Sequence, residues 1–489
     1  MHDPAPSPPP RPAGNAVAIV LAAGAGSRFG GRKLLASIEG RPVLQHVLDR
    51  LAAAGMQGSI VVLGDDAREL QRSITWRDEV RVINPEPNAG LSSSLRIGMA
   101  ALPADAEAAL IVLGDQPRVS PEVIRALLDA GVDEERWVAV PVDAGGDGGR
   151  NPVLLGRAGF ALVEGAEGDR GLGPVIAAQQ RLVREVDVSE LMGDQGNPDV
   201  DTRLDHIRLL TQAWAARVRA NREQVDRIRE VPDGSDFYAP VTSLFRADPT
   251  RTDEPALDAL LSHIRAGETW LDIGAGAGRY ALPVARALAP SGGRVIAVDT
   301  SAAMLAGLAA IAVEHRIENI EVIEARWPPP RVEASRFEAD VSLIAHVSYD
   351  IEDIGTFVAA MEGATRRRCI AMLMERQPSS IADVCWPTVW GEERVSLPAL
   401  PAFVELLRAM GRDVEVLRIE REPRRFASRA ELAGFLRRQL WVADGSAADA
   451  RFEAALDDVI DVDDDGQVGM RGQRPLPIGI ATWSPGRGA

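Results

Sequence analysis

Two cations stand in a glycine-rich segment near the start of the chain. The apolar run Val17–Ala22 predicts a buried central strand, and the segment after it places Arg28 and Lys33 among four glycines. A strand that ends in such a loop presents backbone N–H groups at the carboxyl edge of a sheet, where α/β proteins bind nucleotides. Both cations can neutralise a polyphosphate, although Leu34 after the lysine excludes the ATPase phosphate loop. The simpler interpretation is a βα turn with two solvated cations.

Acidic side chains follow at two later points of the same half. Asp115 comes just after the apolar run Ala109–Leu113, and Asp201 precedes a helical pattern, with Asp199 as the less favoured alternative to it. A carboxylate at the tip of a central strand is well placed for a Mg²⁺ ion that bridges phosphates. The serines Ser92–Ser94 begin another helical pattern, where they could cap the helix or contact a nucleotide base.

The second half repeats the arrangement of strand, glycine loop and acid. Asp272 lies in an apolar stretch that runs into Gly274, Gly276 and Gly278, and Asp299 ends the next apolar stretch. An acid at the end of the second strand is placed to accept both hydroxyls of a ribose. The glycines also satisfy the loose dinucleotide pattern G-x-G-x-x-A, so NAD is one alternative.

Three features favour S-adenosylmethionine over NAD. Asp272 precedes the loop, where its carboxylate can face an amino group, and the glycines run G-x-G-x-G. Met304 stands one turn into the following helix, where it could pack on an adenine. Core packing is an equally good interpretation of this methionine.

The composition is that of an acidic, globular chain of more than one domain. Its 489 residues exceed what one core accommodates, and 54 basic against 71 acidic residues give a net charge of −17. Such a balance argues against a nucleic-acid surface. Cys369 and Cys385 match no metal-ligand spacing, and no apolar run approaches the ~20 residues that span a bilayer. We therefore expect a cytoplasmic protein with reduced thiols and with neither a membrane nor a nucleic-acid partner.

The expected architecture is α/β, with two Rossmann-like three-layer domains and a seven-stranded sheet in the second. Residues 1–14 predict a disordered Pro-rich tail, 15–216 the first domain, 217–236 a helical linker and 237–489 the second domain. Apolar runs predict strands in the first half at 17–22, 59–63, 80–83, 109–113 and 138–141. In the second half they predict strands at 294–298, 340–345, 368–374, 413–419 and 477–483, the last of them antiparallel.

The motifs of the first half, in their order, resemble the molybdenum cofactor nucleotidyltransferases, and the cytidylyltransferase branch above all. The resemblance covers about residues 16–216 and rests on L-A-A-G-x-G-x-R-x-G-x-x-K, G-L-S-S-S-L, L-G-D-Q-P, R-N-P-V and D-x-D-T. It implies transfer of a nucleotide monophosphate from an NTP to molybdopterin, with release of pyrophosphate. It implies catalytic roles for Arg28, Lys33 and Asp115, with Mg²⁺ held by Asp115 and Asp201. The nucleotide-binding residues that it implies are Leu21, Ala22, Ala23, Gly24, Gly26, Lys33, Ser92, Ser93 and Ser94. The opening L-A-A-G favours CTP over GTP.

The second half resembles the class I S-adenosylmethionine-dependent methyltransferases over about residues 237–483. The cofactor-binding residues that this implies are Asp272, Gly274, Gly276, Gly278, Asp299, Thr300, Met304, Glu324 and Ala325. His346 and Tyr349 follow the fourth strand and would face the methyl-acceptor site, although a structural histidine is at least as good an interpretation. The sequence does not indicate which molecule accepts the methyl group.

Together the two halves predict a bifunctional transferase of small-molecule substrates, with molybdopterin among them and a molybdenum enzyme as the recipient of the product. One alternative changes the phosphate acceptor to a sugar or polyol phosphate. Another is a cofactor-binding chaperone or scaffold whose methyltransferase half is inactive. Oligomeric state and coupling between the halves stay open.

Overall fold

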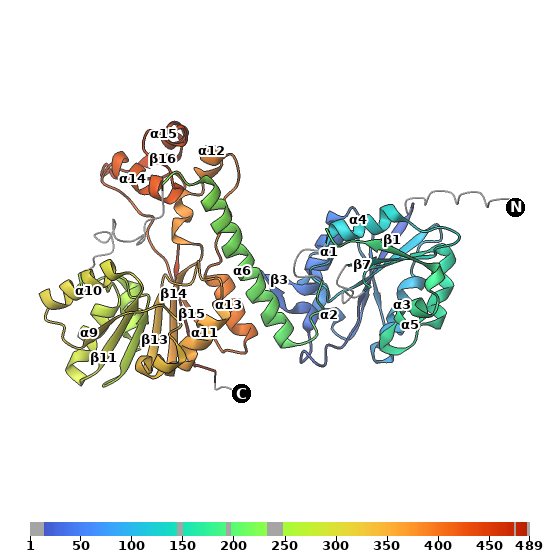
Figure 1. Ribbon diagram of the computed structural model, residues 1–489, viewed down its shortest axis with the longest axis horizontal. Coiled ribbons are helices and arrows are strands. Elements are labelled where there is room, and N and C mark those ends of the chain that lie inside the picture. Colours follow the sequence, from blue (N-terminus) through green and yellow to red (C-terminus); the bar gives the residue numbers. More distant parts are fainter. Residues whose placement is uncertain (1–13, 144–149, 192–196, 232–247, 474–475, 487–489) are drawn as a thin grey trace. The chain divides into compact units, whose positions relative to one another are not determined.

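The computed structural model describes residues 14–143, 150–191, 197–231, 248–473 and 476–486. The chain separates into two compact units, Met1–Leu209 and Leu210–Ala489. Figure 1 colours the chain by residue number, from blue at the N-terminus to red at the C-terminus. The expected tail lies outside the described residues except for Gly14. The end of the expected linker and the first residues of the second expected domain, 232–247, also lie outside them.

The first unit contains a seven-stranded sheet with the order β5-β4-β1-β6-β8-β7-β9. Strand β8 is antiparallel to β6 and β7, and the other neighbouring strands are parallel. The strands are β1 (Ala16–Ala22), β4 (Ile60–Leu63), β5 (Val80–Ile83), β6 (Ala108–Leu113), β7 (Val138–Val142), β8 (Val153–Gly156) and β9 (Val183–Asp187). The α-helices of this unit are α1 (Val43–Ala53), α2 (Ala67–Ser73), α3 (Leu91–Ala100), α4 (Pro121–Ala130) and α5 (Gly173–Ala178), and a small hairpin joins β2 (Ser37–Ile38) to β3 (Arg41–Pro42).

Strand β1 is suited to its interior position between β4 and β6 because every residue in it is apolar. It is almost wholly buried, as expected of a parallel strand covered by helices on both faces. Helix α3 packs closely on it through Gly98, where an added Cβ would lie 2.4 Å from Cγ2 of Ile19. Leu21 pairs with Val62 of β4 and with Leu113 of β6. The carboxyl ends of these three strands therefore meet at one edge.

The second unit contains another seven-stranded sheet, with the order β12-β11-β10-β13-β14-β18-β15. As predicted, β18, the last strand along the chain, is antiparallel to both of its neighbours, β14 and β15. The strands are β10 (Thr269–Ile273), β11 (Arg294–Asp299), β12 (Ile320–Glu324), β13 (Ala339–Ala345), β14 (Thr365–Met374), β15 (Glu415–Ile419) and β18 (Ile478–Trp483). The helices beside this sheet are α8 (Pro255–Leu261), α9 (Ala281–Leu288), α10 (Ala302–Glu314), α11 (Ile354–Gly363) and α13 (Leu400–Ala409). Two Rossmann-like α/β units are thus present, in agreement with the sequence.

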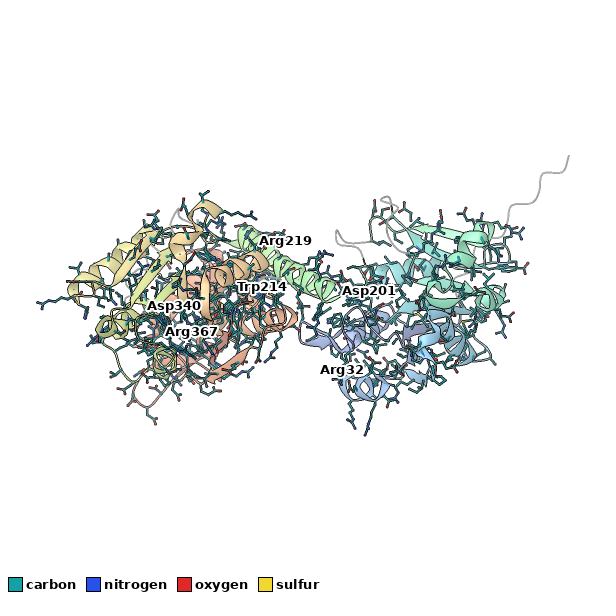
Figure 2. The ribbon with its side chains drawn as sticks, turned by 90° about the horizontal axis from the view of Figure 1, so that it is seen from below. Arg32, Asp201, Trp214, Arg219, Asp340 and Arg367 are labelled. Atoms are coloured by element: carbon teal, nitrogen blue, oxygen red, sulfur yellow. The ribbon has the colours of Figure 1, made fainter. Side chains whose placement is uncertain are left out.

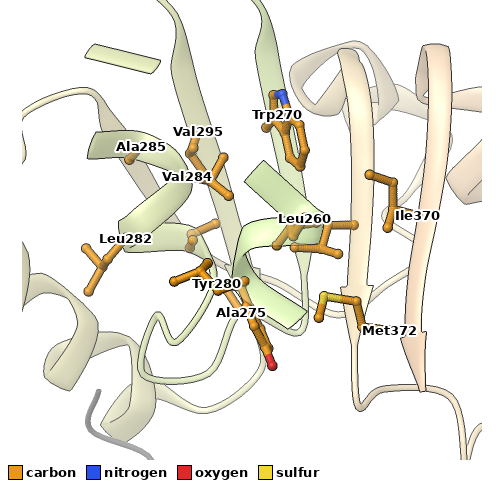
Figure 3. Packing of buried hydrophobic residues seen from close by; sticks show 14 of the residues in the cluster. Leu260, Trp270, Ala275, Tyr280, Leu282, Val284, Ala285, Val295, Ile370 and Met372 are labelled. Carbon is orange, nitrogen blue, oxygen red and sulfur yellow. The ribbon is translucent and has the colours of Figure 1, made fainter. Parts of the chain in front are cut away.

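One face of the second sheet carries an apolar cluster that α8 and α9 complete. Figure 3 shows Trp270 of β10 and Ile370 of β14 around Leu260 of α8. At the amino end of the sheet, Arg367 donates to both carboxylate oxygens of the buried Glu268, which ties the start of β10 to β14. This ion pair lies at the end of the sheet opposite to the carboxyl ends of the strands.

A separate apolar cluster lies outside the sheet and was not predicted. Trp386, Phe426 and Phe452 are central to it. Figure 1 shows its elements gathered apart from the sheet. They are α12 (Trp386–Trp390), α14 (Arg429–Leu440), α15 (Ala447–Val459) and the hairpin of β16 (Ile460–Val462) and β17 (Val468–Met470).

Helix α6 (Arg203–Ile228) begins in the first unit and continues into the second. Within the second unit, Trp214 is buried and donates to the carbonyl of Ile351 at 2.8 Å; Figure 2 labels it on this helix. Gln224 is also buried, donates to the carbonyl of Glu393 and accepts from the amide of Val395, both at 2.8 Å. Within the described ranges, no helix is both long enough and apolar enough to cross a bilayer.

Candidate functional site

Lys33 lies between the two acids that the sequence singled out. Its ammonium donates to Oδ2 of Asp115 and, at 3.2 Å, to Oδ1 of Asp201. Arg28 approaches the other oxygen of Asp201 at 3.5 Å. The side chains of Lys33 and Asp115 are only 12% and 16% exposed, whereas those of Asp201 and Arg28 are 43% and 79% exposed. The structure thus brings all four predicted side chains together.

This arrangement keeps Lys33 charged. Burial would lower the pKa of Lys33, but the charge of Asp115 and the hydrogen bonds to Asp115 and Asp201 outweigh burial and raise that pKa above its ordinary value. Lys33 is also the only lysine of the chain, since every other long basic side chain is an arginine. A compact ammonium fits between two carboxylates as a point charge, without the planar fork of an arginine.

The glycine loop after β1 supplies the backbone that surrounds this lysine. Gly26, Gly30 and Gly31 all have positive φ, at 59°, 94° and 90°, a conformation that glycine adopts without strain. At Gly26 an added Cβ would lie 3.2 Å from Cγ of Lys33. The loop therefore turns tightly around the lysine stem. Leu21, Ala22 and Ala23 bury their side chains, so that only their backbone could face a nucleotide.

Two residues that sequence reasoning missed hold the second acidic segment in place. Gln116 donates to Oδ1 of Asp199 at 2.7 Å, and Asn197 donates to the amide oxygen of Gln116 at 3.0 Å. The amide of Val200 donates to the carbonyl of Asp115 at 3.0 Å. Asp199 is consequently turned to Gln116, while Asp201 faces Lys33. The motif L-G-D-Q-P was the available signal for Gln116.

Two of the three predicted serines form hydrogen bonds within the protein, and the third, Ser92, is buried. Asn84 donates to Oγ of Ser93 at 2.7 Å and to Oγ of Ser94 at 2.9 Å, and both Ser92 and Ser94 are buried. The alternative prediction, that a serine caps the helix, is wrong, because Gly90 is the N-cap of α3 and no side chain caps it.

A pocket of about 400 Å³ lies beside Gly24, and other residues than the serines line it. Asp66 follows β4, and Arg32 pairs with Glu69, another lining residue, at 2.7 Å. Burial, with the charges of Glu69 and Asp65, raises the pKa of Asp66. Sequence reasoning missed this lining because the segment after β4 has no recognisable motif.

The carboxylates of the first unit suit a divalent cation, but only as a partial ligand set. No cluster of three or more potential ligands was found among the residues that the structure describes. Asp115 and Asp201 nevertheless direct oxygens to one positive centre, the Lys33 ammonium. Mg²⁺ usually takes one or two protein carboxylates and completes its shell with phosphate and water. The pair therefore fits a Mg²⁺ ion that arrives with a nucleoside triphosphate.

The glycine loop of the second unit follows β10, and a buried acid lies near the end of that strand. Gly274, Gly276 and Gly278 have φ of 76°, 54° and 81°. Asp272 is 4% exposed, and its Oδ1 has no hydrogen-bond partner among the described residues. Burial, with the charge of Asp299, raises the pKa of Asp272 to about 7. The carboxylate is also hydrogen-bonded to the backbone of Ala281, and its remaining free oxygen, Oδ1, fits the ammonium of S-adenosylmethionine.

Asp299 at the end of β11 is linked to the same loop. Its Oδ2 accepts from the amide of Gly276 at 2.8 Å, and its Oδ1 accepts from the amide of Ser301 at 2.9 Å. Glu324 pairs with Asp299 in register, and the amide of Ala325 donates to the carbonyl of Asp299 at 3.0 Å. Of the two remaining predicted residues, Thr300 is exposed beside this acid and Met304 is buried in α10.

His346 and Tyr349 lie at the carboxyl end of β13, in a turn with unusual backbone. His346 and Ser348 have φ of 57° and 95°, which marks local strain of the kind that functional sites hold. Burial, with the charges of Arg421 and Arg279, lowers the pKa of His346 to about 4, so it is neutral at pH 7. The Tyr349 hydroxyl lies 3.5 Å from Nδ1 of His346 and accepts from the amide of Met374 at 2.8 Å.

Comparison with known proteins identifies the two halves. Residues 18–183 match the family model of the MobA-like NTP transferase domain, and residues 271–367 match that of a methyltransferase domain. Among curated relatives, the bifunctional protein GlmU of an Exiguobacterium species is 34% identical over 113 residues, which cover 23% of this chain and 25% of that protein. The same-named protein of Methylibium petroleiphilum is 31% identical over 177 residues, 34% of this chain and 36% of that protein. The chain thus spans a quarter to about a third of these relatives.

Solved structures match each half separately. Rv0371c of Mycobacterium tuberculosis H37Rv is 29% identical and covers 40% of this chain and 98% of its own, with a TM-score of 0.35. The YcgJ protein of Bacillus subtilis is 16% identical and covers 48% of this chain and 99% of its own, with a TM-score of 0.33.

Proposed function

We propose that this fusion of a MobA-like NTP transferase domain with a methyltransferase domain is a bifunctional enzyme. Its first half transfers a nucleotidyl group, CMP from CTP, to molybdopterin and releases pyrophosphate. Its second half transfers a methyl group from S-adenosylmethionine to a small-molecule acceptor. We further propose that it works in the cytoplasm and passes its product to a molybdenum enzyme.

The contact of Lys33 with Asp115 and Asp201 carries the first proposal. When Mg²⁺ is bound, Asp115 and Asp201 would hold it, and the ion supplies positive charge to the phosphates. Lys33 and Arg28 then bind the triphosphate and stabilise the charge that grows on it during transfer. The glycine loop contributes backbone N–H groups at the same edge.

The proposed phosphate acceptor, molybdopterin, and the proposed nucleobase, cytosine, rest on motifs rather than on contacts. The opening L-A-A-G supports CTP, and the ordered set of motifs supports molybdopterin. Nucleotidyl transfer to a sugar or polyol phosphate is the second candidate, because Lys33 and Arg28 are assigned to the triphosphate and leave the acceptor open.

The deciding experiment supplies the purified chain with molybdopterin, Mg²⁺ and either CTP or GTP. Pyrophosphate release and product mass are followed for the wild type and for Lys33→Ala, Asp115→Ala and Arg72→Ala, the last a control on α2. We expect cytidylyl transfer that the first two variants lose and the control keeps. Transfer to sugar 1-phosphates instead of molybdopterin would establish the second candidate. Binding of CTP without transfer to either acceptor would contradict both and support the scaffold alternative.

Two features at the carboxyl ends of β10 and β11 support the proposal for the second half. Asp272 is buried and its Oδ1 has no partner among the described residues, and Asp299 is fixed beside the glycine loop by the amide of Gly276. S-adenosylmethionine supplies the methyl group, and the chain has to bind and align it with the acceptor, which does not require a dedicated base. The neutral His346 is available as an acceptor contact. Titration calorimetry with S-adenosylmethionine tests this half independently of the first.

A further inference from the structure

Two arginines share one carboxylate beside the glycine loop of the second unit. Arg251 donates from Nε to Oε2 of Glu254 at 2.5 Å, and Arg279 donates to its Oε1 at 2.8 Å. Both guanidinium groups also lie over the ring of Tyr280, at 5.7 and 5.6 Å from its centroid. The cluster therefore has two positive charges and one negative charge.

The donors of this cluster are not all used. Nη1 of Arg251 donates to the carbonyl of Asp248 at 3.2 Å. Its Nη2 is buried and has no partner among the described residues. An unpaired buried donor on a charged group is costly, so a cluster with surplus positive charge and a free buried N–H favours a bound anion.

The cluster lies at the edge where the cofactor is expected. Arg279 directly follows Gly278, the last glycine of the loop. Figure 3 shows the hydroxyl of Tyr280 leaving the apolar core beside Ala275 of the same loop. The charge of Arg279 also contributes to the low pKa of His346. The cluster, the loop and the end of β13 thus surround one region.

The chemistry of the methyl donor indicates which anion this is. S-Adenosylmethionine has two positive groups, the ammonium and the sulfonium, and its only anionic group is a carboxylate. Asp272 offers one unpartnered oxygen, Oδ1, to the positive groups, and Asp299 is placed for the ribose hydroxyls. The carboxylate of S-adenosylmethionine is then the group without a partner in the protein. In the cluster, Nη2 of Arg251 is the buried donor without a partner among the described residues.

We propose that Arg251 binds the carboxylate of the methionine part of S-adenosylmethionine and that Glu254 positions Arg251 for this contact. The assignment rests on the proposed methyl-donor site. It adds to that site a residue from outside the glycine motif. Recognition of the methyl donor then depends on both the positive ammonium and the negative carboxylate of its methionine part.

Decarboxylated S-adenosylmethionine tests the assignment, because it lacks the carboxylate and keeps both positive groups. Its affinity and that of S-adenosylmethionine would be measured by calorimetry on the full chain, for the wild type, Arg251→Met, Arg251→Lys and Arg286→Met. Arg286 is an exposed arginine of α9 and serves as the matched control. Thermal melting of each variant shows that it is folded.

We expect the wild type to prefer S-adenosylmethionine at least tenfold. Arg251→Met should lose that preference by weakening S-adenosylmethionine alone, Arg251→Lys should keep part of it, and Arg286→Met should match the wild type. Equal weakening of both compounds by Arg251→Met would show a structural role and overturn the proposal, and so would no effect on either. A wild type that binds neither compound would remove the methyl-donor site itself, which is a different failure.

Discussion

Replacing Lys33 by methionine should strengthen the binding of a divalent cation in the absence of nucleotide. The Lys33 ammonium contacts both Asp115 and Asp201, so it occupies the position where the two carboxylates would bind a metal ion. An ion that arrives alone must displace this ammonium from both acids. A methionine of similar length removes the competing charge and keeps the stem against the loop.

The expected gain follows from the distance. An ammonium 3.2 Å from Oδ1 of Asp201 interacts with it by about 1–5 kcal/mol at effective dielectric constants of roughly 80 to 20. Asp201 is 43% exposed, which places the contact near the lower limit because solvent screens it. We therefore expect about 1.5 kcal/mol, or roughly tenfold in Kd.

Electron paramagnetic resonance of free Mn²⁺ measures this affinity directly. Wild type, Lys33→Met and Arg32→Met would be titrated without nucleotide; Arg32 pairs with Glu69 and serves as the control cation of the same loop. Lys33 is the only lysine, so supplying ¹³Cε-lysine during expression labels one side chain for nuclear magnetic resonance. Its resonance should move when Mn²⁺ is replaced by Mg²⁺ and CTP. Unchanged or weaker Mn²⁺ binding by Lys33→Met, with the control equal to the wild type, would refute the reasoning.

Three further predictions concern the cofactor edge and the core. Asp299→Ala should weaken S-adenosylmethionine by about 1.5–3 kcal/mol, since it removes a charged acceptor; equal calorimetric affinities would contradict the placement. The pKa of Asp272 is raised to about 7, so its ionised fraction, and with it the affinity for S-adenosylmethionine, should rise from pH 6 to pH 8; Asp272→Asn should show no such rise. Gly98→Ala should destabilise the first unit by about 1–3 kcal/mol in urea unfolding, because the new Cβ would lie 2.4 Å from a side chain of β1; Gly173→Ala, where nothing lies within 4 Å, should cost little, and equal effects would contradict the packing argument.

The sequence predicted the central strands and the loops that follow them because these features are local. Strand β1 is a continuous apolar run, and the positive φ of Gly276 and Gly278 belongs to a motif that only glycine satisfies without strain. Asp115 and Asp299 were placed correctly at strand ends, because parallel strands bring their carboxyl ends to one edge.

What the sequence did not predict depends on side-chain contacts that no periodicity or motif shows. The pattern around Ser93 does not show that Asn84, earlier in the same connection, holds its hydroxyl, and nothing near Gln116 shows that it binds the distant Asp199. The cluster around Trp386 was missed for a related reason. Its buried apolar residues come from α12, α14, α15, the β16–β17 hairpin and the connections beside them, so no single stretch carries the pattern.

Helix α6 has a practical consequence for dissecting the two activities. Gln224 supplies both a donor and an acceptor to the backbone at Glu393 and Val395, much as a neighbouring strand would. A gene fragment that starts at the expected second domain, residue 237, leaves those backbone groups without their partner and uncovers Ile351, which Trp214 contacts. A separately expressed methyltransferase half should therefore start near residue 210, and a truncation series across the helix would locate the shortest fragment that remains monodisperse.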